Sequence, residues 1–140
     1  MTHIKMKSGD FTFTARLDEE GTPETSKWFL KQLPFKISVI QAAWSGPAFF
    51  TDLNWIGFDV PFEKATSYPL PGQVIMYPGD ERGNSGEIYI PYGGNCFACP
   101  RGQLAGNPFL IITEGVEQLE VFGRKVRWEG AQEIAFEKVE

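Results

Sequence analysis

The chain has 140 residues, of which 42% are hydrophobic and 22% charged, and both fractions are ordinary for a globular protein. This length predicts one domain that buries about two-thirds of the surface of the unfolded chain. The formal net charge of −5 excludes the basic footprint that nucleic acid binding needs. No apolar run approaches the roughly 20 residues of a membrane-spanning helix, and the N-terminus lacks the apolar core of a secretory signal. If the chain begins at its native start, we expect a cytoplasmic protein that binds neither nucleic acid nor membrane.

The first elements predicted along the chain are a β-hairpin and a helix. HIKMKSG (3–9) and FTFTARL (11–17) alternate in polarity and are separated by turn residues. In the following segment Thr22 is a candidate N-cap, and Pro23 suits the first helical position. The helical body is expected from 25 to 33, and the proline directly after it ends the helix.

Further apolar and alternating runs predict a series of strands. They are FKISVIQAAW (35–44), AFFTDL (48–53), GQVIMYPG (72–79), EIYIPYGG (87–94), NPFLIIT (107–113) and QEIAFEKV (132–139). In EIYIPYGG, alternation sends Glu87 and Tyr89 to one side and Ile88, Ile90 and Tyr92 to the other. Between the second and third runs, residues 54–71 read as a loop with a short extended piece at 58–60.

A second helix is predicted before the last strand. Val116, Leu119, Phe122 and Val126 recur at helical spacing, with Gly123 as an interruption. The strands are clustered and the two helices lie far apart in the chain, which is not the alternation of a parallel α/β fold. The sequence therefore predicts a mainly β fold: a single closed or nearly closed antiparallel barrel of about eight strands capped by two helices.

The two cysteines form a single C-x-x-C, Cys96 and Cys99. A structural zinc site needs four ligands, yet His3 is the sole histidine. Haem attachment requires a histidine where Pro100 stands, and the Gly- and Pro-rich residues after Cys99 do not favour the helix that activates a redox cysteine. We interpret both cysteines as small apolar residues on or beside a strand and expect no metal ligand and no cofactor.

Other catalytic patterns are incomplete. Ser45 lies in AWSGP without the nucleophile-elbow motif, so we assign it to a turn. His3 is at a terminus, and PGDERGNSGE lacks calcium-ligand spacing. Glu87 and Glu114 at strand edges form a candidate acid–base pair, although solvated carboxylates at strand ends are far commoner. We expect no catalytic residue, and whether the protein is an enzyme stays open.

Aromatic residues near glycine-flanked strand ends suggest a small-molecule pocket at the barrel mouth, although they would equally fill the barrel. Tyr89 belongs to this aromatic group, and Asn107 is a further candidate polar anchor. The predicted ligand-binding residues are Trp44, Tyr77, Glu87, Tyr92, Asn95, Phe97 and Arg101.

Several words of the sequence, taken in order, resemble a family of uncharacterised bacterial and archaeal proteins with a cyclophilin-like fold. They are LPFKISVIQAAWSGPAFF, GQVIMYPG, GEIYIPYGG, GQLAGNPF and GRKVRWEGAQEIAFE, and together they extend over nearly the entire chain. The resemblance implies one cyclophilin-like domain over residues 1–140. The Arg-Phe-Gln set of proline isomerases has no match here, and Ala43 and Pro108 stand where relatives often carry Arg and His.

Two functions from different classes follow from these observations. The first is a protein that binds a small molecule or a partner subunit without covalent catalysis. The alternative is an enzyme, either a residual peptidyl-prolyl isomerase or a hydrolase of small amides. A third reading, a structural role within a homo-oligomer, stays open.

Overall fold

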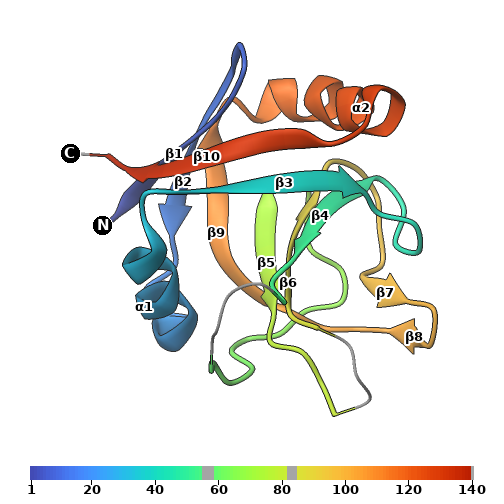
Figure 1. The fold of residues 1–140 in the computed structure, drawn as a ribbon. Helices are drawn as coiled ribbons and strands as arrows, with labels where there is room; N and C mark the ends of the chain where they lie inside the picture. Colours follow the sequence, from blue (N-terminus) through green and yellow to red (C-terminus); the bar gives the residue numbers. More distant parts are fainter. Residues whose placement is uncertain (55–58, 82–84, 140) are drawn as a thin grey trace.

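Eight strands of a computed structural model, which describes residues 1–54, 59–81 and 85–139, form a closed barrel in the order β1-β10-β3-β4-β6-β5-β9-β2 (Figure 1). Every neighbouring pair is antiparallel. The strands are β1 (His3–Ser8), β2 (Phe11–Leu17), β3 (Phe35–Gln41), β4 (Ala48–Asp52), β5 (Gln73–Tyr77), β6 (Glu87–Pro91), β9 (Asn107–Glu114) and β10 (Gln132–Lys138). The predicted fold class is confirmed.

The predicted strands correspond to observed ones with shifts of a few residues at their ends. The first hairpin pairs β1 with β2 from His3 opposite Arg16 to Ser8 opposite Phe11. No strand forms at Asp59 or Val60, where an extended piece was expected, and Phe58 lies outside the described residues. Within residues 59–71 the backbone instead makes an isolated bridge from Thr66 to Gly106.

Helix α1 (Pro23–Gln32) begins at the predicted proline, but its N-terminus is capped by a distant residue. Thr22 occupies the N-cap position without making a capping hydrogen bond, because its Oγ1 donates to the Asp18 carbonyl at 2.8 Å. The carboxylate of Glu63 accepts instead from the amides of Glu24 and Thr25, at 3.0 and 2.8 Å. Thr22 is therefore at the predicted N-cap position, but the capping side chain comes from the loop after β4.

A buried amide on β9 holds that loop in place. The Asn107 side chain is 0% exposed, and its Oδ1 accepts from the Glu63 amide at 2.8 Å. Its Nδ2 donates to the Thr25 hydroxyl at 3.0 Å and to the Pro61 carbonyl at 2.9 Å. Asn107, a candidate polar anchor for a ligand in the sequence, is therefore hydrogen-bonded to the loop and to α1.

The predicted second helix is a short 3₁₀ turn, η1 (Val116–Gln118), that continues into α2 (Leu119–Glu129). Gly123 lies within α2 and does not interrupt it, in contrast to the prediction. A Cβ at this position would overlap the ring of Tyr92, so the missing side chain makes room for that ring. The glycine thus serves a close approach of the helix to the strand end.

Each helix inserts one phenylalanine into the barrel core. Phe29 of α1 packs edge-on against Phe109 of β9 and Phe136 of β10, at centroid distances of 5.1 and 5.4 Å. Phe122 of α2 packs against Phe13 of β2 and Phe49 of β4, at 6.0 and 5.3 Å. Since α1 leads into β3 and α2 into its antiparallel neighbour β10, the helices cover opposite ends of this strand pair (Figure 1).

A second, smaller apolar cluster lies on the outer face of the barrel wall. Alternate residues of a strand point to opposite faces, so Ile88 and Ile90 of β6 enter the main core while Tyr89 points outward. Phe97 and Leu104 cover that outer face, from the segment that carries the short pair β7 (Ala98–Cys99) and β8 (Gly102–Gln103). Strand β6 is consequently buried on both sides.

The described helices are all too short or too polar to cross a lipid bilayer.

Replacing Gly123 by Ala tests the contact between α2 and Tyr92. Alanine is favoured over glycine in a helix by about 1 kcal/mol, whereas overpacking typically costs about 1–3 kcal/mol. We expect the overlap with the Tyr92 ring to prevail, so that G123A lowers the free energy of unfolding measured with urea. In a Tyr92→Ala background the same change should raise it, and a stabilising effect in both backgrounds would contradict the packing argument.

Replacing Glu63 by Gln tests the cap of α1. One carboxylate receives two amides and the Thr25 hydroxyl, and a glutamine can accept through only one of its two terminal atoms. We expect the free energy of unfolding to fall by about 1 kcal/mol, the usual value of a helix cap. The matched control is Glu20→Gln, an exposed change of equal charge, which should leave stability unchanged.

Candidate functional site

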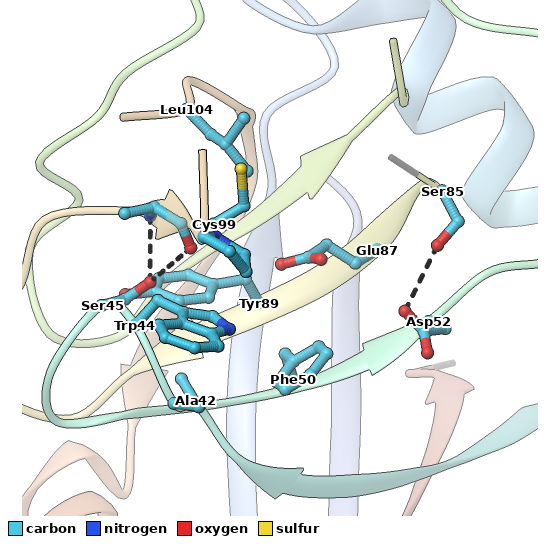
Figure 2. A pocket seen from close by; sticks show the side chains of 13 residues that line it. Ala42, Trp44, Ser45, Phe50, Asp52, Ser85, Glu87, Tyr89, Cys99 and Leu104 are labelled. Carbon is cyan, nitrogen blue, oxygen red and sulfur yellow. Dashed lines mark hydrogen bonds between the residues drawn. The ribbon is translucent and has the colours of Figure 1, made fainter. Parts of the chain in front are cut away.

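The site with the most chemistry is a pocket of about 240 Å³ on the outer face of the barrel wall (Figure 2). It lies between the outward faces of β4 and β6 and the segment that contains β7, and so it is not at the barrel mouth, where a pocket was expected. Its lining residues are Ala42, Ala43, Trp44, Ser45, Phe50, Asp52, Ser85, Glu87, Tyr89, Ala98, Cys99, Pro100 and Leu104.

Glu87 is the central ionisable group of the pocket. Figure 2 shows its carboxyl group directed from β6 toward the side of the pocket formed by Tyr89, Trp44 and Cys99. Burial, together with the negative charge of Asp52, raises the pKa of Glu87 from 4.5 to about 8. Within the described part of the chain this carboxyl group has no hydrogen-bond or ion-pair partner. A carboxyl group in this state stays protonated near neutral pH and has capacity for a partner.

The carboxylate nearest to Glu87 in the strand register is Asp52, because the two residues face each other across β4 and β6. Asp52 is exposed and accepts a hydrogen bond from the Ser85 hydroxyl at 3.3 Å. Glu114, which the sequence suggested as the acid–base partner of Glu87, is the exposed last residue of β9 and does not line this pocket. The pairing of carboxylates is therefore set by the sheet register and involves Asp52.

Three aromatic side chains form the walls of the pocket. Trp44 stands at its rim, with 62% of its surface exposed, and Phe50 projects from β4. Tyr89 is 1% exposed, and burial raises its pKa well above the usual range, so that its phenol remains neutral. The pocket thus combines two carboxyl groups with aromatic surface (Figure 2).

Ser45 ties the two sides of the pocket together. Its Oγ accepts a hydrogen bond from the Ala98 amide at 3.0 Å and donates one to the Ala98 carbonyl at 3.2 Å. The Ser45 carbonyl also accepts from the Cys96 amide at 3.0 Å. These bonds join the turn between β3 and β4 to the start of β7, as the assignment of Ser45 to a turn anticipated, and they occupy its hydroxyl.

Tyr77 and Phe97, two of the predicted ligand-binding residues, lie behind the pocket in the second apolar cluster. Phe97 packs against Tyr77 and Tyr89 at centroid distances of 5.6 and 4.6 Å. Asn95 accepts from the Tyr89 hydroxyl at 2.7 Å and donates to the carbonyls of Pro69 and Gly93, both at 3.0 Å. Phe97 and Asn95 thus contact Tyr89, a wall of the pocket, and neither of them lines the cavity.

Tyr92 and Arg101, also predicted to bind a ligand, lie outside the pocket. Tyr92 donates to Gln41 at 2.7 Å and lines a separate surface groove beside α2. Arg101 is exposed in the turn between β7 and β8. Of the predicted residues, the structure therefore brings Trp44 and Glu87 into one pocket, and their role in binding stays a prediction.

Both cysteines lie on or beside a strand, as predicted. Cys99 belongs to β7 and lines the pocket, Cys96 precedes that strand, and both are free thiols of intermediate burial. Within residues 1–54, 59–81 and 85–139, no three His, Cys, Asp or Glu side chains come together as a metal site.

Phe50, Asp52 and Ser85 line the pocket although the sequence analysis did not single them out. A signal for Phe50 and Asp52 was present, because alternation along AFFTDL directs them to the same side of the strand. The sequence did not indicate that this strand pairs with β6, and it is this pairing that places Asp52 opposite Glu87.

The raised pKa of Glu87 makes stability depend on pH. Between about 4.5 and 8 the folded protein keeps a proton that the unfolded chain releases, so the free energy of unfolding falls as pH rises through this window. Glu87→Gln removes the titrating group. We expect E87Q to match the wild type at pH 4.5 and to exceed it at pH 9 by up to about 5 kcal/mol, since a difference of one pKa unit between the folded and unfolded states corresponds to about 1.4 kcal/mol. Urea titrations at both pH values test this, with the exposed Glu114→Gln as control; equal pH profiles for all three proteins would contradict the placement of Glu87.

The chain is similar in fold to solved structures, two of which match nearly its full length. The first, titled "Structure of McbB in complex with tryptophan", has a TM-score of 0.69 and 19% identity over 96% of this chain, which spans 44% of the McbB chain. The second is the solution structure of the hypothetical protein AF2241 from Archaeoglobus fulgidus, with a TM-score of 0.57 and 14% identity over 99% of this chain and 95% of that one. At these identities the likeness concerns the fold alone.

No curated protein matches the sequence significantly. The model of a family described as a protein of unknown function, DUF3830, matches residues 4–138, and the chain therefore belongs to the DUF3830 family.

Proposed function

We propose that this protein binds a small molecule in the pocket at Glu87, without covalent chemistry of its own. The observation that carries the proposal is the Glu87 carboxyl group, partly buried, directed into the pocket and without a partner in the described structure. Because the group is only partly buried and has no protein partner in the described structure, its oxygens are available for a hydrogen bond or an ion pair with a ligand. A site of this kind combines apolar walls with few polar anchors, as small-molecule sites do.

The dimensions of the pocket favour a compact ligand. Its volume of about 240 Å³ lies below the range of about 300–1,000 Å³ that is usual for drug-sized molecules. Trp44 at the rim would cover such a ligand from the solvent side. A metabolite of a few carbon atoms with one polar head is therefore the class we expect.

The shared fold gives the proposal further support. McbB, a protein with a similar fold, has been solved with tryptophan bound, which is a small amphipathic molecule. We further propose that residues 1–140 form a single cyclophilin-like domain, as the sequence resemblance implies and as the barrel with two helices permits.

The residues at the pocket do not favour covalent catalysis. The Ser45 hydroxyl is engaged with the Ala98 backbone, and nucleophilic catalysis needs a base beside the nucleophile. His3, the only histidine of the sequence, lies in β1, away from the strands that form the pocket. A hydrolase of small amides is therefore the weaker reading.

The alternative in which the protein is an enzyme draws on one observation. A carboxyl group whose pKa is about 8 is suited to donate or accept a proton near neutral pH. The described pocket lining holds no Arg-Phe-Gln set of the kind that proline isomerases use, so we expect a short X-Pro peptide to isomerise at the uncatalysed rate in a coupled assay. Clear acceleration would favour the enzyme.

Binding is tested with a library of small cationic, anionic and neutral metabolites, tryptophan included, by thermal shift and ¹⁵N-detected NMR. A ligand that binds only the folded state stabilises it. We expect hits that shift the amide signals of Ser45 and Ala98. Their affinity should fall about tenfold, or about 1.4 kcal/mol, in Trp44→Ala and in Glu87→Gln, because aromatic residues are prominent among those whose truncation weakens binding and because the second variant removes the anchoring carboxyl group.

The control for Trp44→Ala is Trp128→Ala. Trp128 is 76% exposed on α2 and lines the other groove, so its loss removes the same side chain without touching the pocket. The proposal would be contradicted if the library gave no hits, or if the affinity of the hits fell in Trp128→Ala and stayed unchanged in the two pocket variants.

A further inference from the structure

This inference rests on the proposed binding pocket and specifies what it holds: we propose that the ligand is a small organic cation, a substituted ammonium, bound between the Glu87 carboxylate and the aromatic walls. The geometry that supports it is the convergence of Glu87 and Asp52, paired across β4 and β6, on a cavity walled by Trp44, Phe50 and Tyr89. Figure 2 shows these groups arranged around one space.

The charges around the cavity favour a positive occupant. Two carboxyl groups line it, and the described lining residues include no lysine and no arginine. Opposite charges in contact near a protein surface attract each other more strongly than in bulk water, because the effective dielectric constant is lower there. An anion would be repelled by the carboxylate of Asp52, and the net charge of −5 adds to this repulsion at longer range.

The aromatic walls act in the same direction. The π face of an aromatic ring is negative and attracts a cation placed over it, with tryptophan the best partner. Trp44 stands at the rim of the pocket with 62% of its surface exposed, so a large part of its ring is accessible to a ligand. A quaternary or alkylated ammonium presents methyl groups to these faces and its charge to Glu87.

Cation binding at this site is coupled to proton release. The neutral carboxyl group of the empty pocket loses its proton to solvent when the ammonium arrives, and the resulting carboxylate pairs with the cation.

The other titratable groups that face Glu87 from neighbouring elements are Asp52 on β4, Tyr77 on β5 and Cys99 on β7, with Tyr89 on its own strand. Of these groups only Asp52 acts on Glu87 through its charge, and this negative charge favours the protonated form of Glu87. Affinity therefore rises with pH up to about 8 and then levels off.

The test compares cations with neutral molecules of the same shape. Choline and 3,3-dimethyl-1-butanol differ by nitrogen against carbon at one centre, and n-butylammonium and 1-butanol, which differ by an ammonium against a hydroxyl group, form a second pair. Dissociation constants are measured by NMR titration at pH 6.5 and 8.5 in one phosphate–borate buffer, in which both cations stay charged. We expect at least one cation to bind at least tenfold more tightly than its neutral partner at pH 8.5, and about tenfold more tightly there than at pH 6.5.

Variants assign the preference to the carboxyl group. Glu87→Gln should remove both the cation preference and the pH dependence, whereas Glu114→Gln, an exposed change of equal charge, should keep both. If neither cation exceeds its neutral partner while metabolites of another class bind at Trp44 and Glu87, the cation proposal is overturned and the pocket proposal stands. If no compound of the library or of the two pairs binds, both proposals fail together.

Discussion

Strand β6 has to bury both of its faces, and the arrangement of the pocket depends on how that is achieved. Ile88 and Ile90 fill the barrel, while Tyr89 points outward and packs beneath Phe97. An isolated barrel would leave such outward aromatics in water, so the segment around β7 and β8 folds back over them. This cover reaches Tyr89 but leaves a cavity over Glu87, two residues earlier on the same face. The pocket is thus the gap between a barrel wall and its outer lining.

The rest of the molecule gives that wall a rigid support. Phe29 and Phe122, both 0% exposed, enter the core from the two helices, and edge-to-face packing of such rings adds about 0.5–1.5 kcal/mol per pair to the burial itself. Asn107 and Glu63 join the loop after β4 to the N-terminus of α1 through side-chain hydrogen bonds. A site that is held by strands with a packed core behind them keeps its geometry without the ligand, which limits the entropy that binding has to offset.

The carboxyl group of Glu87 is the costly feature of this arrangement. A buried carboxylate without a partner is so unfavourable that the group retains its proton, and the nearby Asp52 increases this tendency. A buried leucine or valine at position 87 would make a more stable wall. The energetic conflict between stability and an ionisable group in a cavity is typical of functional sites, where local rules of packing are broken for the sake of chemistry.

Local patterns in the sequence were sufficient for the fold class. Alternation along FTFTARL and EIYIPYGG, the proline before α1 and the helical spacing of Leu119, Phe122 and Val126 all act between near neighbours, where periodicity reports the buried face directly. The roles of single residues were decided by partners far along the chain: Glu63 rather than Thr22 caps α1, Gly123 accommodates Tyr92 instead of ending a helix, and Asp52 meets Glu87 through the β4–β6 register. Trp44 and Glu87 could be chosen from residue type and strand position, but their meeting on the outer wall could not. Sequence determined which segments form strands and helices, because those depend on local spacing; tertiary structure alone decided which side chains share a cavity, because that depends on the register between distant strands.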